Sequence, residues 1–219
     1  KFQTVHRVTD INYIDKLLEI CLTNNIKLVI PTIDTELLIL SREKDKFLSH
    51  GIQILVCSQS VNKIFFDKRN THLFFNNNGI PSPNLYNSSE AQELPQSSFP
   101  LLLKPNNGSS SIGVTKVLNH KELLFFFDYL EDPIIQDFID GKEYTVDVLL
   151  DLNGNVKCIV PRLRVETRAG EVSKSITVRD FEIIDWASKI AVLLKGAIGC
   201  ITIQCIKQKN GAIKFIEIN

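Results

Sequence analysis

The sequence lacks an excess of either charge, because 25 Lys and Arg balance 25 Asp and Glu over 219 residues. This balance argues against a nucleic-acid or anionic-membrane partner, since either would favour a basic surface. No apolar run reaches the roughly 18 residues of a membrane-spanning helix. The first residues also lack the apolar core of a signal peptide. We therefore expect a cytoplasmic protein of one or two domains that binds neither nucleic acid nor membrane.

The spacing of the cysteines gives no support for a metal-binding framework. The five cysteines are odd in number and form no CxxC pair or Cys/His pattern of the kind that holds zinc. We expect all five to be buried, reduced thiols in a cytosolic protein. They are Cys21, Cys57, Cys158, Cys200 and Cys205.

Several catalytic signatures are missing as well. The sequence contains no Walker A motif and no GxGxxG fingerprint, and its histidines form no Ser/His/Asp or Cys/His grouping, so hydrolase chemistry has no support. A dinucleotide-binding oxidoreductase is suggested only by the α/β pattern near the N-terminus. The sequence begins with Lys1 rather than Met and stops on a candidate ligand, Asn219, so we expect a fragment trimmed at one or both ends.

The sequence divides into two regions with different patterns of expected helix and strand. Residues 1–60 alternate helix and strand, with helices expected after Asp10 and over 35–50, which indicates a parallel sheet. Residues 61–219 read as an α+β unit of short strands and antiparallel hairpins, with helical sequence over 60–77. We expect a first lobe over 61–135 and a second lobe over 136–219.

The closing hairpin, 201–219, carries the most informative pattern. Asn210-Gly211 is a strong two-residue turn, and closing the hairpin there sets Gln204 opposite Glu217. Asn219 shares the strand face of Glu217 because it follows two residues later. Three oxygen-bearing side chains then converge, which suits Mg²⁺ held jointly with phosphates. The alternative is that these residues merely cover the solvent-exposed face of an edge hairpin.

Two stretches could supply cations for phosphates. Lys104 ends a buried strand and precedes a loop rich in Gly and Ser, whose backbone amides can approach phosphate oxygens. Lys68 stands at the expected start of a helical segment. Taken alone, the first stretch also fits a flexible hairpin loop, and the lysine of the second also fits a solvated surface residue. The loop residues of interest are Gly108, Ser109, Ser110 and Ser111.

A middle hairpin gathers charge on one face. A turn at Asn153-Gly154 sets Glu143 opposite Arg164 and Thr145 opposite Arg162. An expected loop over 162–174 adds further cations, which suit the charge that develops in phosphoryl transfer. An amphipathic hairpin with surface ion pairs is the alternative. The candidate catalytic cations are Arg162, Arg164, Arg168 and Lys174.

Four motifs in this order resemble the ATP-grasp superfamily, in the group similar to the carbamoyl-phosphate synthase large subunit. The motifs are Asp67-Lys68-Arg69, Leu103-Lys104-Pro105 with the 107–113 loop, the 135–147 segment, and Gln204 with Glu217-Ile218-Asn219. The resemblance covers nearly the whole chain. It implies a partial Rossmann-like domain over 1–60, followed by an ATP-grasp fold of two α+β lobes over 61–219.

The resemblance also implies a site. Lys68 and Lys104 would contact the phosphates of ATP, and Glu143 would bind ribose hydroxyls. Gln204, Glu217 and Asn219 would hold Mg²⁺, with Mn²⁺ as a substitute. The backbone of a strand would meet adenine, over Gln136, Asp137, Phe138 and Ile139.

The expected activity is that of an ATP-dependent carboxylate–amine ligase acting on small molecules. ATP would activate a carboxylate as an acyl phosphate, which an amine then attacks. The family usually continues Asn-Pro-Arg after the final Asn, so a fragment ending at Asn219 could be inactive. The alternative is a non-catalytic or regulatory nucleotide-binding module. The oligomeric state is left open, with a homodimer as one candidate.

Overall fold

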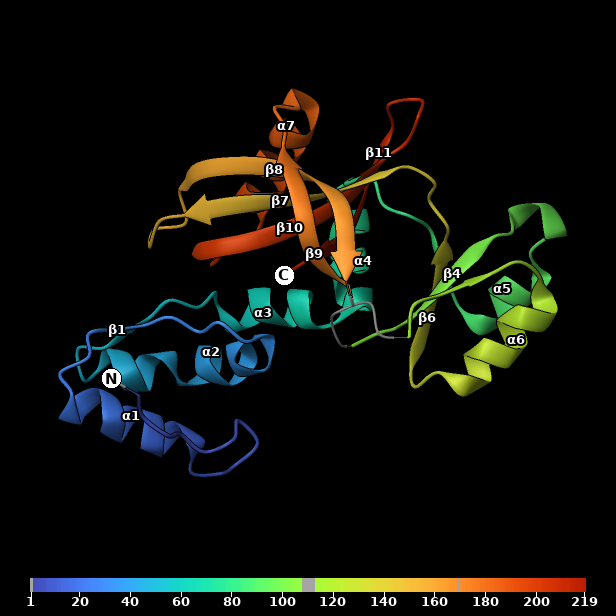
Figure 1. Ribbon diagram of the computed structural model, residues 1–219. Coiled ribbons are helices and arrows are strands. Elements are labelled where there is room, and N and C mark those ends of the chain that lie inside the picture. The colour runs from blue at the N-terminus through green and yellow to red at the C-terminus, as the bar shows by residue number, and fades with distance from the viewer. Residues whose placement is uncertain (1, 108–112, 169) are drawn as a thin grey trace.

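The computed structural model describes residues 2–107, 113–168 and 170–219. Figure 1 shows three parts, which are a small N-terminal α/β part, a five-stranded sheet and a four-stranded sheet. Each part has its own cluster of buried apolar side chains. The mixture of an α/β part with antiparallel sheets agrees with the fold class expected from the sequence.

The N-terminal part alternates helix and strand, as predicted, and its two short strands pair in parallel. Helix α1 begins at Tyr13, later than expected. The Asp10 carboxylate accepts a hydrogen bond from the Asn12 backbone amide and so holds a turn before the helix instead of capping it. The elements are α1 (Tyr13–Thr23), β1 (Leu28–Val29), α2 (Asp34–Leu48) and β2 (Gln53–Ile54).

The helical segment expected over 60–77 is two helices, α3 (Gln59–Phe66) and α4 (Lys68–Asn77). Asp67 lies between them with extended backbone angles, so it ends the first helix. Its carboxylate accepts a hydrogen bond from the Asn70 amide at 2.9 Å and caps the second. This break makes Lys68 the first residue of α4.

The five-stranded sheet has the order β11-β10-β7-β8-β9, and all its pairs are antiparallel. One face is buried with α7, α3 and α4, through side chains such as Val146, Ile203 and Phe215. The expected loop over 162–174 is wrong, because residues 162–168 lie in β8 and residues 171–174 lie in β9. The elements are β7 (Lys142–Leu150), β8 (Val156–Arg168), β9 (Glu171–Thr177), α7 (Phe181–Leu193), β10 (Gly199–Lys207) and β11 (Ile213–Ile218).

The four-stranded sheet has the order β3-β6-β4-β5 and packs against α5 and α6. Helix α5 was not expected, and its sequence signal is the capping box of Asn87 and Glu90. The elements are β3 (Leu85–Tyr86), α5 (Ser88–Glu93), a 3-10 turn (Gln96–Ser98), β4 (Leu101–Pro105), β5 (Thr115–Val117), α6 (His120–Tyr129) and β6 (Pro133–Asp137).

The boundaries at 60/61 and 135/136 remain predictions. Val61, Phe65 and Phe75 from α3 and α4 pack into the core of the five-stranded sheet. These residues lie in the stretch that we assigned to the first lobe. Their apolar contacts are therefore with the sheet that we assigned to the second.

Both predicted hairpin registers are confirmed, but the two-residue turns are wrong. In the closing hairpin Gln208 pairs with Ala212 around a three-residue loop, and in the middle hairpin Asp151 pairs with Asn155 in the same way. The third loop residue is a glycine at positive φ, as in a type I turn with a following bulge. A second bulge in each ladder shifts the register by one residue, which restores the expected pairs.

Gly141 precedes β7, where the chain passes close to β10. An added Cβ would lie 2.5 Å from the Lys207 carbonyl oxygen and 2.7 Å from a methyl carbon of Ile206. We expect Gly141→Ala to lower the free energy of unfolding by about 1–3 kcal/mol, as overpacking does. Urea denaturation measures this change. Gly211→Asn is the control, since Gly211 meets open space and Asn tolerates positive φ. Equal stability of Gly141→Ala and wild type would contradict the close approach.

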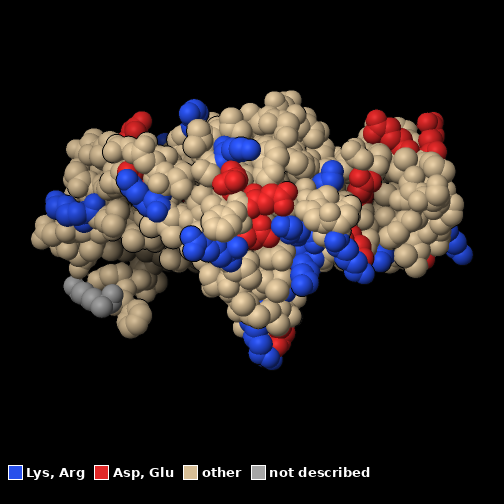
Figure 2. Space-filling model, turned by 90° about the horizontal axis from the view of Figure 1, so that it is seen from above, with Lys and Arg blue, Asp and Glu red and all other residues tan. Residues whose placement is uncertain are grey.

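The expectation that all five cysteines are buried is wrong for two of them. Cys158 and Cys200 are exposed, whereas the other three cysteines are buried, and all five are free thiols. Acidic and basic side chains lie next to one another on the face shown in Figure 2. Within the described ranges, no helix has the length and apolar character needed to cross a membrane.

Candidate functional site

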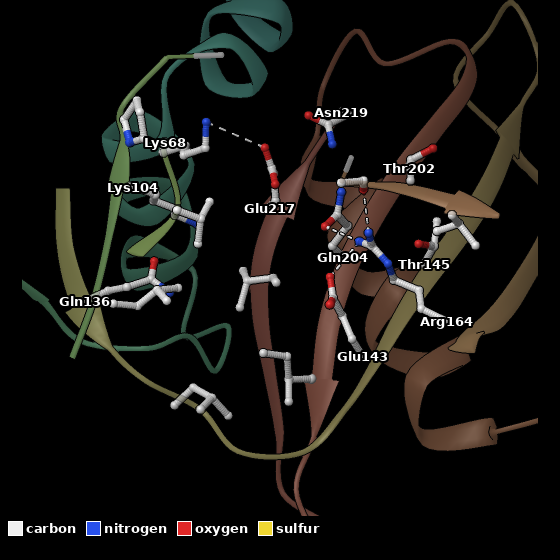
Figure 3. A pocket seen from close by; sticks show the side chains of 18 of the residues that line it. Lys68, Lys104, Gln136, Glu143, Thr145, Arg164, Thr202, Gln204, Glu217 and Asn219 are labelled. Carbon is white, nitrogen blue, oxygen red and sulfur yellow. Dashed lines mark hydrogen bonds and ion pairs between the residues drawn. The ribbon is translucent and has the colours of Figure 1, made fainter. Parts of the chain in front are cut away.

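A cleft of about 870 Å³ opens between the two sheets. Residues of β4 and β6 line one side, and residues of β7, β8, β10 and β11 line the other. Figure 3 shows Lys68, Lys104 and Gln136 facing Glu217 across this space. A third wall comes from Thr32–Asp34, at the end of the segment that enters α2, which sequence reasoning did not place near the site.

The two predicted lysines meet in the cleft. The Lys68 ammonium lies 3.8 Å from the Glu217 carboxylate and donates to the Asn106 carbonyl at 3.3 Å. Lys104 is only 6% exposed. Burial is the main cause that lowers the pKa of Lys104 to about 8, and nearby Lys68 lowers it further, while the Glu217 and Glu143 carboxylates oppose the change. Keeping the buried Lys104 ammonium charged therefore lowers the stability of the free protein, and an anionic ligand in the cleft would offset this cost.

The predicted oxygen ligands come from the closing hairpin. Gln204 pairs with Glu217 across β10 and β11, and Asn219 exchanges backbone hydrogen bonds with Thr202 at 2.6 and 2.7 Å. All four residues line the cleft. Oxygen atoms of one carboxylate and two amides are thus available on one sheet face, together with the Thr202 hydroxyl.

This donor set fits a magnesium ion that shares its coordination with phosphates. Hard oxygen ligands suit Mg²⁺, which usually takes one or two carboxylates and keeps other positions for substrate oxygens or water. Among the described residues, no group of three or more His, Cys, Asp or Glu side chains could hold a metal. A protein-only cage of such ligands is therefore not seen in the part of the chain that the structure describes.

A β-bulge brings an apolar residue beside the carboxylate. Gln204 pairs with Glu217 whereas Cys205 pairs with Phe215, so Ile216 is the extra residue of β11. Ile216 and Glu217 both line the cleft although they are adjacent in sequence. A strand without a bulge would have sent one of them to the buried face, and the sequence pattern alone did not identify Ile216.

Arg164 organises the floor of the cleft instead of pointing freely into it. Its guanidinium donates to Glu143 at 2.6 Å, to the Gln204 side chain at 3.2 Å and to the Gly170 carbonyl at 2.8 Å. The Arg164 side chain is 8% exposed. Arg164 therefore orients one candidate ribose ligand and one candidate metal ligand at once.

The other three candidate cations are paired with carboxylates. Arg162 lines the cleft and holds Asp147 through two hydrogen bonds of 2.5 and 2.9 Å. Arg168 and Lys174 both bind Glu166, and their side chains are 78% and 68% exposed. Neither of these two is among the residues that line the cleft, so the structure does not bring them into the site.

The candidate adenine end is formed by β6 and the segment after it. Gln136, Phe138 and Ile139 line the cleft, but Asp137 does not. The Asp137 carboxylate instead accepts hydrogen bonds from the Tyr86 hydroxyl at 2.7 Å and the Asn84 amide at 3.0 Å. Its side chain therefore links β6 to the segment entering β3 and faces away from the site.

Further lining residues were missed because they carry no chemical signature. Leu102, Ile206 and Ile216 give the cleft an apolar portion, and Thr145, a residue that is 5% exposed, adds a hydroxyl. Their alternation with buried residues predicts a sheet face but not its use. The predicted Gly108, Ser109, Ser110 and Ser111 lie outside the described residues.

Comparison with known proteins finds relatives of the N-terminal part and of the rest of the chain. The sequence matches the PylC-like N-terminal domain over residues 1–55. A D-alanine–D-alanine ligase from Haemophilus ducreyi is 26% identical over 202 residues, which cover 77% of this chain and 62% of that protein. The corresponding enzyme from Marinomonas sp. is 32% identical over 112 residues, which cover 47% of this chain and 33% of that protein. The chain therefore spans between about a third and two thirds of the length of these relatives.

A solved structure has the same fold. The biotin carboxylase domain of Hydrogenobacter thermophilus 2-oxoglutarate carboxylase, in complex with MgADP and bicarbonate, aligns with a TM-score of 0.76 and 18% identity. The alignment covers 100% of this chain and 53% of that one. The ATP-grasp domain family itself matches residues 65–219, the greater part of the sequence. The chain belongs to the ATP-grasp domain family, as the four sequence motifs predicted.

Proposed function

We propose that this chain binds ATP and Mg²⁺ and belongs to a ligase that activates a small-molecule carboxylate as an acyl phosphate for attack by an amine. The single observation that carries the proposal is the cleft in which Lys68 and Lys104 face Glu217 and Gln204. Cations on one wall and oxygen ligands on the other match the needs of a magnesium-bound polyphosphate. Family membership and ligases among the relatives support the same reaction class.

Different cleft residues would bind the different parts of ATP and the metal. Lys68 and Lys104 hold the phosphates, and the segment 136–139 with Glu143 receives adenine and ribose. Gln204, Glu217 and Asn219 would hold Mg²⁺, or Mn²⁺ in its place. When bound, the metal neutralises phosphate charge and so favours transfer of the phosphoryl group.

The arginines take different parts from those first expected. We propose that Arg164 positions Glu143 and Gln204, since it hydrogen-bonds both. Arg162 remains the candidate for contact with the transferred phosphoryl group or the substrate carboxylate, since it lines the cleft. Arg168 and Lys174 are not assigned to that contact, because both are exposed and paired with Glu166.

A thermal-shift experiment tests nucleotide binding. ATP or ADP with Mg²⁺ should raise the melting temperature, because a ligand that binds only the folded state stabilises it by about 2.7 kcal/mol at a hundredfold excess over Kd. NAD⁺ is the control and should cause no shift. Absence of a shift with millimolar ATP and Mg²⁺ would contradict the proposal. Release of ADP on addition of pooled amino acids would then separate a ligase from a nucleotide-binding module without activity.

A further inference from the structure

Asn106 connects two segments of the chain without reaching the cleft. It is 2% exposed, and it lies between Pro105 and Asn107, which both line the cleft. Asn106 itself does not line it. Any influence of this residue on a ligand must therefore pass through its protein partners.

Each polar group of Asn106 has a partner. Its backbone amide donates to the Asp132 carbonyl at 3.0 Å, and its carbonyl accepts from both the backbone amide and the ammonium of Lys68, each at 3.3 Å. Its side-chain oxygen accepts from the Arg69 amide at 3.1 Å, and its side-chain nitrogen donates to the Asp67 carboxylate at 2.9 Å. Buried hydrogen bonds of this kind specify one arrangement of the segments that they join.

These bonds cap α4 from a distant part of the sequence. The first amides of a helix have no partner within the helix. Here the backbone amides of Lys68 and Arg69 donate to oxygen atoms of Asn106, and the Asn70 amide donates to the Asp67 carboxylate. The position of Lys68 is thus set by the segment that directly follows Lys104.

We propose that Asn106 is a positioning residue that fixes Lys68 relative to Lys104, so that both ammonium groups meet the phosphates of one nucleotide. This inference rests on the proposed function, because it needs a polyphosphate in the cleft. A site whose cations are already in place loses less conformational freedom on binding and so binds more tightly. Asn106 touches neither the ligand nor the metal in this account.

The variant Asn106→Asp tests the role with little change of shape. It keeps an acceptor for the Arg69 amide but places a carboxylate oxygen against Asp67, where a donor stood. We expect ATP affinity to fall about tenfold or more, since about 1.4 kcal/mol corresponds to tenfold, and adenosine affinity to change less than about twofold. Adenosine lacks the phosphates, so it reports on the rest of the cleft.

A second change should restore binding. In Asp67→Asn/Asn106→Asp the donor and acceptor exchange places, and Asn at position 67 can still cap α4. We expect ATP affinity to return to within about threefold of wild type, as coupling between contacting residues predicts. Hydrogen exchange of the Arg69 amide should be faster in the single variant, because repulsion between the carboxylates of residues 67 and 106 displaces its acceptor, and slow again in the double variant.

The outcomes separate this inference from the proposed function. Unchanged ATP affinity in Asn106→Asp, equal losses for ATP and adenosine, or a folded double variant that still binds ATP weakly each overturn the positioning role. Failure of the wild-type chain to bind ATP overturns the proposed function and this role with it. If the single variant does not fold, ATP binding by the double variant decides alone.

Discussion

Glu217→Gln is expected to remove most of the magnesium dependence of ATP binding while leaving the fold intact. Glu217 supplies the one formal negative charge among the three candidate metal ligands, and its replacement by Gln preserves shape. Loss of residues that merely support a metal ligand costs about 10–100-fold in affinity, so we expect at least a hundredfold weakening of ATP binding in Mg²⁺. ATP affinity measured with Mg²⁺ and with a chelator tests this expectation.

A matched control is available in the same cleft. Glu143→Gln makes the same chemical change at a residue that Arg164 holds at 2.6 Å and that is not one of the candidate metal ligands. This variant should weaken ATP binding without altering the ratio of affinities with and without Mg²⁺. Glu217 also lies 3.8 Å from Lys68, so a plain ion pair is the competing role. That role predicts the same Mg²⁺ dependence in Glu217→Gln as in wild type.

Lys104→Met should weaken ATP binding and stabilise the free protein at the same time. Met keeps most of the buried stem and removes the charge. Loss of a charge-assisted hydrogen bond costs about 1.5–3 kcal/mol, or about 10–100-fold in ATP affinity, whereas adenosine affinity should barely change. The free protein should gain up to about 3 kcal/mol of stability at pH 7, because burial lowers the pKa of Lys104 to about 8 and its charge opposes folding.

The same lysine predicts a pH dependence with a definite sign. The unfolded chain holds the Lys104 proton up to its ordinary pKa of about 10.5, so between about pH 8 and pH 10.5 the unfolded state binds more protons and stability rises with pH. Phosphates favour the charged form. ATP binding above pH 8 should therefore take up a proton, and ATP affinity should fall as the pH rises.

Calorimetry in two buffers of different ionisation enthalpy measures this proton. The uptake at pH 9 should disappear in Lys104→Met and persist in Lys121→Met, which removes a lysine of α6 outside the cleft. Equal weakening of ATP and adenosine in Lys104→Met would instead show that the residue supports the whole pocket. Persistent proton uptake in that variant would assign the titration to another group.

The facing pairs of the two hairpins could be predicted because strand periodicity limits the answer. Gln204 opposite Glu217 and Thr145 opposite Arg162 follow from alternation, since a slip by one residue would bury polar groups. The turns could not be predicted as well. Asn-Gly favours a two-residue loop, and a three-residue loop with glycine in its last position uses the same residues.

Tertiary contacts account for what the sequence did not reveal. Nothing local places Thr32–Asp34 beside the cleft, because that wall depends on how the N-terminal part sits against the large sheet. The cationic cluster near Arg168 and Lys174 was assigned to the site by composition, yet both side chains pair with Glu166 at the exposed hairpin. Charge density along a sequence does not reveal which charges already have partners.

The bulge in β11 means that this strand is one residue longer than its sheet requires. Without Ile216, the ladder from Ile213 to Ile218 would pair with β10 in one unbroken register, and Glu217 and Ile218 would keep their present faces. The pairing of these residues therefore does not itself require the additional residue. Its side chain lines the cleft, so the bulge gives the cleft an apolar surface directly beside the carboxylate of Glu217, the candidate metal ligand.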